Sequence, residues 1–185
     1  MPTEPSVSVG VAAGTPVVDP FEMADRYADF GGRIPAVAFA RLRELLEGVD
    51  DVDVELRFSR NAEGRCQVVG HASFAGKANC HWCLEPVDVF VTAEVNLYVV
   101  ASEIEASELG GAHDTHLLEE GSTTPIVALI EDDLILALPS RACTDEACPR
   151  RPEVAFPADD AEAQDQEKPF EILAKLKDSG QIRSE

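Results

Sequence analysis

The chain has 185 residues, with 35 aspartates and glutamates against 15 lysines and arginines, so its formal net charge at pH 7 is −20. This length is enough for one domain with its own hydrophobic core and too short for two full domains. The charge repels phosphates and so disfavours direct, non-specific nucleic-acid binding. It favours a basic protein partner, or it serves solubility alone, which is the plainer interpretation.

The sequence predicts a reducing, cytoplasmic environment. Residues 1–15 lack a basic segment followed by an apolar run, and no stretch approaches the roughly 18 apolar residues of a membrane span. The chain has 5 cysteines, an odd number. Without an export signal, close cysteine pairs hold a metal or do redox work more often than they form structural disulfides.

The first helix is predicted after a flexible arm. Residues 1–18 are rich in proline, serine, glycine and other small residues, with too little apolar content to pack. From Ile34 to Leu46 apolar residues recur at helical spacing and charged residues take the other side. Pro35 suits the first turn of this helix, and Gly48 suits its C-terminal stop.

Alternating apolar and polar residues predict strands in the middle of the chain. Strict alternation indicates a half-buried strand from Asp51 to Arg60, and two further strands follow, over residues 65–74 and, more broken, 76–80. The clearest strand runs from Pro86 to Val100, where every odd position from Val87 onward is apolar. Cys66, the unpaired cysteine, is predicted to be a buried strand residue.

The last third of the chain is predicted to alternate between loops and helices. Residues 102–122 are acidic and indicate a mobile loop. A second helix is expected over residues 125–138, with Thr124 as its cap and a proline as its stop. Residues 149–168 read as an acidic linker, and residues 169–185 as a short C-terminal docking helix and tail.

These elements predict an α+β fold. We expect an antiparallel sheet of four or five strands between Asp51 and Val100, with the two main helices packed on it. The single α+β domain is expected to span residues 19–148.

Two close cysteine pairs suggest the chemistry of the chain. They are Cys80 with Cys83, and Cys143 with Cys148. One tight turn can direct two thiolates at the same ion, and two such turns complete the four-sulfur shell of a structural zinc ion. The first pair lies between two predicted strands, whereas a thioredoxin-like motif needs a helix start. One structural zinc ion is therefore predicted, with a redox disulfide or plain reduced thiols as alternatives.

Three adjacent acids and one tryptophan are candidate partner-binding residues. Glu131, Asp132 and Asp133 lie on one predicted helix and point to different faces, which disfavours chemistry and favours a solvated surface or a docking surface for a basic partner. Trp82, in the first cysteine turn, suits an interface anchor, with core packing as an equal alternative. No histidine has a credible catalytic partner, so no catalytic residue is predicted.

Several motifs follow one another in a characteristic order. They are Cys80-x-x-Cys83-Leu84-Glu85-Pro86, the long strand, Leu129-Ile130-Glu131-Asp132-Asp133-Leu134-Ile135-Leu136-Ala137-Leu138-Pro139, Cys148, Pro169-Phe170, and Leu173-Ala174-x-Leu176-Lys177. In the front half, Gly32, Ile34-Pro35, Arg41-Leu42 and Gly70 agree too. The combination resembles the YceD family, the bacterial and plastid large ribosomal RNA subunit accumulation proteins. The likeness covers roughly residues 19–177.

The chain departs from that family at two places. Many relatives carry a basic or Gln-Arg pair where this chain has His81-Trp82, so these inner positions look tolerant. Relatives commonly show a histidine near the position of Cys143. A structural zinc shell tolerates an exchange of histidine and cysteine, because both residues are good ligands of the same ion.

The resemblance implies a non-enzymatic role in large ribosomal subunit biogenesis and in accumulation of large-subunit (23S) ribosomal RNA. The acidic charge favours a lysine- and arginine-rich ribosomal protein, or a large-subunit precursor particle, as the partner. A thiol redox or zinc-dependent enzyme is the main alternative, and a closed shell of four thiolates argues against both because it leaves no open position. Direct RNA binding is a third possibility, disfavoured by the charge.

Overall fold

The computed structural model describes residues 10–12, 15–111, 113–143 and 148. The helices are α1 (Pro20–Asp25), the 3-10 turn η1 (Ala36–Ala38), α2 (Ala40–Leu45), α3 (Glu103–Leu109) and α4 (Val127–Leu136). The strands are β1 (Gly10–Ala12), β2 (Thr15–Val18), β3 (Asp29–Ile34), β4 (Gly48–Val49), β5 (Val52–Arg60), β6 (Cys66–Asn79), β7 (Pro86–Val100), β8 (Asp114–Leu117) and β9 (Thr124–Pro125). The predicted linker and docking helix lie outside the described residues.

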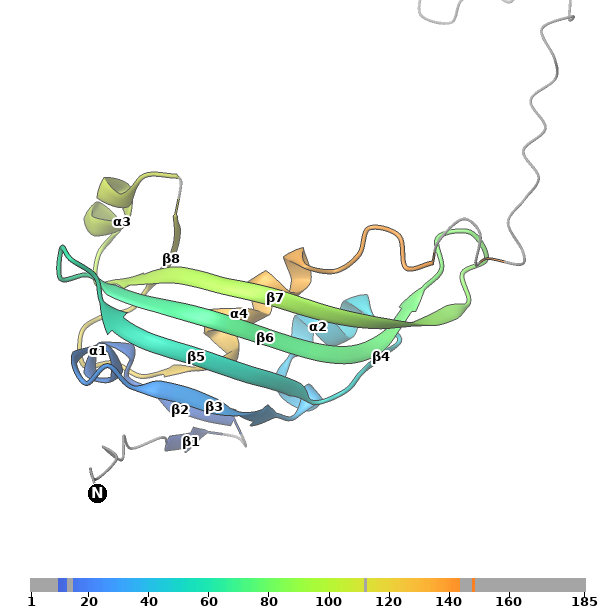
Figure 1. The fold of residues 1–185 in the computed structure, drawn as a ribbon, viewed down its shortest axis with the longest axis horizontal. Coiled ribbons are helices and arrows are strands. Elements are labelled where there is room, and N and C mark those ends of the chain that lie inside the picture. The colour runs from blue at the N-terminus through green and yellow to red at the C-terminus, as the bar shows by residue number, and fades with distance from the viewer. Residues whose placement is uncertain (1–9, 13–14, 112, 144–147, 149–185) are drawn as a thin grey trace, which may run out of the picture. The chain divides into compact units, whose positions relative to one another are not determined.

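A six-stranded mixed sheet dominates the fold (Figure 1). Its strand order is β3-β5-β6-β7-β8, with β4 pairing beside β6. The central strands β5, β6 and β7 form an antiparallel meander, and β8 runs parallel to β7. Helices α2 and α4 lie on one face of the sheet. The α+β class and the mostly antiparallel sheet are confirmed, while the strands outnumber the four or five predicted.

The alternation predicted for the central strands places their apolar residues in the core. In β5, Val52, Val54, Leu56 and Phe58 are buried and the residues between them are exposed. Strand β7 is buried at odd positions from Val91 to Val99. Cys66 is buried in β6 as predicted, and burial raises the pKa of its thiol to about 11. A period of two along these strands therefore separates the core face from the outer face.

Part of the predicted flexible arm is a strand. Thr15–Val18, assigned to the flexible arm, forms β2 and pairs with β9, and Val18 is buried. Thr124 lies in that pairing and therefore does not cap α4 as predicted; the N-cap of α4 is Ile126. Helix α1, which follows directly, is capped by the Asp19 carboxylate, which accepts hydrogen bonds from two backbone N–H groups. These elements lack strong periodicity and were not predicted.

The single helix predicted from Ile34 to Leu46 is divided. Ile34 is the last residue of β3 and pairs with Val52 of β5. The chain then turns through η1, and α2 begins only after Phe39, whose backbone is not helical. Phe39 is fully buried. The helical spacing of the sequence therefore spans a strand end, a 3-10 turn and a short helix.

Two other predicted segments differ in the structure. Strand β6 is one strand of 14 residues where the sequence suggested two shorter ones. The acidic segment 102–122, predicted to be a mobile loop, contains α3 and β8, and β8 pairs with the end of β7. Within the described residues, no helix is long and apolar enough to cross a membrane.

Candidate functional site

The first cysteine pair lies in the turn between β6 and β7. The Cys80 backbone N–H donates to the Glu85 carbonyl at 2.9 Å, and the Leu84 N–H donates to the Cys80 carbonyl at the same distance. Leu84 takes a positive φ of 61°, which turns the chain back towards β7. The prediction that this pair lies between two strands is confirmed, and the two strands form a hairpin.

All four predicted thiols meet at this turn. The Sγ atom of Cys80 lies 2.6 Å from that of Cys143 and 3.7 Å from that of Cys148. The Sγ atoms of Cys80, Cys83 and Cys148 all lie within 4.8 Å of one another. Because Cys143 and Cys148 follow α4, the cluster joins the end of the hairpin to the chain that leaves this helix.

The cluster favours a thiolate at Cys80. Its pKa is lowered to about 6, first by the hydrogen bond from the Cys143 thiol and then by the backbone N–H of Cys83. The Trp82 N–H also points at the Cys80 sulfur, at 3.4 Å. The pKa of Cys143 is raised to about 12 because its thiol donates to Cys80. Donors directed at one sulfur prepare it to bind a cation.

The spacing of the sulfur atoms suits a metal ion in part. In a tetrahedral site with metal–sulfur bonds of about 2.3 Å, neighbouring sulfurs lie about 3.8 Å apart. The 3.7 Å between Cys80 and Cys148 agrees with that edge. The 2.6 Å between Cys80 and Cys143 is shorter, so coordination would require this pair to separate by about 1 Å. The cluster could therefore hold a metal ion after a small local adjustment.

His81 is a possible ligand that sequence reasoning missed. One of its ring nitrogens lies within 4.8 Å of the sulfurs of Cys80 and Cys143. Its ring also packs on that of Trp82, with centroids 5.0 Å apart. Trp82 is half-buried, and its role as an interface anchor stays a prediction. The position of a histidine beside a cysteine is the signal that could have identified His81 as a candidate ligand.

Of the three acids predicted to contact a partner, Glu131 is turned into the protein. It is 7% exposed. One carboxylate oxygen accepts the backbone N–H groups of Arg41 at 3.0 Å and Leu42 at 3.2 Å, and the other pairs with the Arg41 guanidinium at 3.1 Å. Helix α2 has no capping side chain of its own. Glu131 therefore caps α2 from α4 and is removed from the predicted partner surface.

The other two acids are more accessible. Asp132 is exposed and pairs with Arg41 at 2.7 Å. Asp133 is half-buried, and burial raises its pKa to about 6, with smaller contributions from Asp114 and Asp132. A partner-binding role for this part of α4 stays a prediction.

Replacing Glu131 should destabilise the fold through α2. Glu131→Ala leaves two backbone N–H groups without their acceptor and should lower the free energy of unfolding by about 3 kcal/mol. Glu131→Gln keeps one oxygen acceptor and should cost about 1–2 kcal/mol. Urea unfolding followed by circular dichroism measures both values. Asp132→Asn is the matched control, because it removes only an exposed ion pair, and a loss equal to that of Glu131→Ala would refute the capping role.

The cysteine cluster lies in the part of the chain that matches a known protein family. The family model described as Large ribosomal RNA subunit accumulation protein YceD matches residues 68–177 of this chain. The chain is also similar to the Large ribosomal RNA subunit accumulation protein YceD of Haemophilus influenzae, with 28% identity over 167 residues, which cover 86% of this chain and 94% of the relative. No solved structure matches it. The matched segment contains β7, α4 and all four clustered cysteines.

Proposed function

We propose that this protein supports production of the large ribosomal subunit, because the chain belongs to the YceD family of large ribosomal RNA subunit accumulation proteins. The observation that carries this proposal is the family match, which spans residues 68–177. The name of the H. influenzae relative, which is matched over nearly its whole length, supports the same role. In this proposal the protein acts in the cytoplasm and favours accumulation of large-subunit (23S) ribosomal RNA.

The proposed role needs no catalysis by this chain. In our proposal Cys80, Cys83, Cys143 and Cys148 hold one structural zinc ion, and the bound ion would supply a cross-link between the β6–β7 hairpin and the chain after α4. Four thiolate ligands close the coordination shell and leave no position for a substrate. A redox enzyme is less well supported, because Cys80 and Cys83 lie in the turn between β6 and β7 and not at the start of a helix.

The proposed partner is a basic ribosomal protein, alone or on a large-subunit precursor particle. With a net charge of −20 the chain attracts lysine- and arginine-rich surfaces and repels RNA phosphates. Binding to this acidic chain would keep such a partner from non-specific contacts until the ribosomal subunit is assembled. Trp82, Asp132 and Asp133 remain proposed contacts of this partner.

Loss of the protein should lower the ratio of large- to small-subunit ribosomal RNA. The measurement is electrophoretic quantification of both RNAs in a deletion strain and in the same strain carrying the gene on a plasmid. The plasmid should restore the ratio. An unchanged ratio in the deletion strain would refute the proposed function.

A further inference from the structure

The outer face of the main sheet has no helix of the described chain packed on it. Helices α2 and α4 lie on the opposite face (Figure 1). On the outer face, Asp53, Ser73 and Thr92 lie side by side, from β5, β6 and β7, and Ala75 and Phe90 form the next row. Phe90 is 74% exposed and lies in the first half of β7, where β8 does not pair with this strand. A large exposed apolar side chain on an open sheet face is a candidate contact for a partner.

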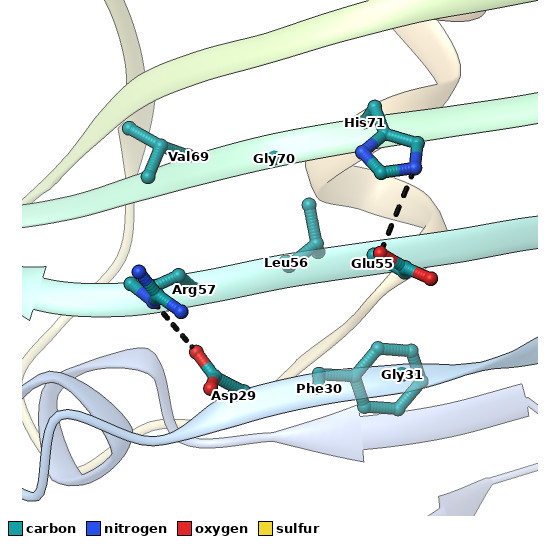
Figure 2. A pocket seen from close by; sticks show the side chains of 9 residues that line it. All are labelled: Asp29, Phe30, Gly31, Glu55, Leu56, Arg57, Val69, Gly70 and His71. Carbon is teal, nitrogen blue, oxygen red and sulfur yellow. Dashed lines mark hydrogen bonds and ion pairs between the residues drawn. The ribbon is translucent and has the colours of Figure 1, made fainter.

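One hollow of this face is lined by charged side chains of both signs. Figure 2 shows it above β3, β5 and β6, with a volume of about 430 Å³. Arg57 pairs with Asp29 at 2.9 Å on one side, and His71 lies 3.7 Å from Glu55 on the other. Arg57 offsets one of the two acids that line this hollow, and Phe30, its one aromatic lining residue besides His71, is buried, so the hollow offers no exposed aromatic ring of the kind found at Phe90.

A second hollow, the Phe90 hollow, has surplus negative charge. It has a volume of about 520 Å³, and its lining residues include Phe90, Asp50, Asp51, Asp53 and Arg33. Arg33 is held by Asp53 in a bidentate ion pair, with distances of 2.8 and 2.9 Å. Within the described residues, no ion pair neutralises Asp50 or Asp51.

The nearest other cation is also engaged. Lys77, on the neighbouring strand, pairs with Asp88 at 2.5 Å. Asp51 accepts the backbone N–H of Ala36 at 3.1 Å, which fixes its carboxylate at the rim without changing its charge. Arg33 and Lys77 attract Asp51 and Asp50 from a distance, but both cations are paired directly with other acids. The Phe90 hollow thus combines two carboxylates, which form no direct ion pair with any described residue, with one exposed aromatic ring.

We infer that the Phe90 hollow is the docking position for an arginine side chain of a basic protein partner. This inference rests on the proposed function, and it adds a contact on the outer sheet face to those proposed at Trp82, Asp132 and Asp133. A planar guanidinium can stack on an aromatic ring while its N–H groups bind carboxylates, and lysine cannot do both in the same way. The occupant that fits is therefore an arginine-rich segment of a protein, and the surplus negative charge disfavours RNA.

The inference can be tested with two labelled peptides, five repeats of Arg-Ser and five repeats of Lys-Ser. Fluorescence anisotropy should show that the wild-type chain binds the arginine peptide about fivefold more tightly than the lysine peptide. Phe90→Leu should abolish this preference. Asp50→Asn combined with Asp51→Asn should weaken binding of the arginine peptide about tenfold. Each variant should unfold at the temperature of the wild-type protein, because these side chains lie at the surface.

A control double variant separates local binding from general attraction. Glu119→Gln with Glu120→Gln removes the same charge from exposed positions outside the Phe90 hollow, and it should weaken binding less than twofold. Equal losses in the two double variants would overturn the inference, as would an unchanged arginine preference in Phe90→Leu. The inference would also be overturned, in favour of an RNA site, if the wild-type chain bound a ten-nucleotide RNA at the same concentrations and Phe90→Leu or the Asp50 and Asp51 double variant lost that binding.

Expression of the same variants in the deletion strain distinguishes this inference from the proposed function. If the deletion lowers the ribosomal RNA ratio and the Asp50 and Asp51 double variant restores it fully, the docking position is refuted and the function stands. If the deletion leaves the ratio normal while the hollow variants lose the peptide, the proposed function is refuted and the site stands.

Discussion

Replacing Gly70 by alanine should lower the free energy of unfolding by about 4 kcal/mol, because a β-carbon at this position has no space. It would lie 2.0 Å from the carbonyl oxygen of Glu55 and 2.9 Å from the Cα of Leu56. Both atoms belong to the backbone of β5, which pairs with β6 at this point. Relief of the clash would require the two central strands to separate.

The backbone conformation of Gly70 adds to this effect. Its φ of 158° is one that residues with a side chain rarely adopt. Chemical unfolding in urea, followed by circular dichroism, measures the loss. If the variant does not accumulate as folded protein, protease sensitivity of the purified chain reports the same defect.

Gly31→Ala is the matched control for this experiment. Gly31 lies on β3, which pairs with the other edge of β5, and a β-carbon there would meet no atom within 4 Å. The substitution should therefore change stability by no more than about 1 kcal/mol, and it could be stabilising because alanine restricts the unfolded chain. Comparable losses in both variants would show that glycine is needed for a reason other than the approach of β5.

The sequence predicted the central strands because burial on one face imposes a period of two. Val52 to Phe58 and the odd positions of β7 show that pattern, and the structure confirms it. Cys80 and Cys83 were correctly placed at a hairpin tip because they fall between two such patterns. Local alternation is enough to predict these strands, since each strand of the meander pairs with the next one along the chain.

The predictions that differ from the structure depend on contacts distant in sequence. Helical spacing continues through Ile34, but pairing with Val52 makes this residue part of a strand. Thr124 has the side chain of a good helix cap, yet it pairs with Val18. Glu131 is an acid among other acids, which is typical of an exposed surface. Only the tertiary fold brings the N-terminus of α2 to its carboxylate. Tertiary pairing overrides local propensity at all three positions.

The cysteine cluster shows both the strength and the limit of sequence reasoning. Spacing alone grouped Cys80 and Cys83, and the second pair could be assigned to the same cluster because thiolates in two turns suit one tetrahedral ion. The structure brings the sulfurs of both pairs together. The position of His81 beside a cysteine marks it as a candidate ligand, but only the structure shows that the turn brings its ring to the sulfurs of Cys80 and Cys143.

Purified protein prepared without chelator should contain about one zinc ion per chain, and removal of this ion should cause a large loss of stability. Inductively coupled plasma mass spectrometry measures the metal content, and thermal unfolding with and without a strong chelator measures its effect. The ion would join two segments far apart in sequence, so its loss frees both. Folded, reduced protein without zinc would refute the proposed ligand shell.

Replacing a single ligand should have the effect of removing the ion. Cys83→Ser should lower the zinc content well below one ion per chain and the free energy of unfolding by about 3 kcal/mol or more. Cys66→Ala is the matched control, because Cys66 is buried in β6 and lies outside the cluster. It should lose about 1 kcal/mol from packing and keep its zinc. The chelator should then destabilise Cys66→Ala as much as the wild-type chain and leave Cys83→Ser unchanged. If instead the chelator affects neither the wild type nor Cys66→Ala, the four cysteines are plain thiols whose contribution is packing alone.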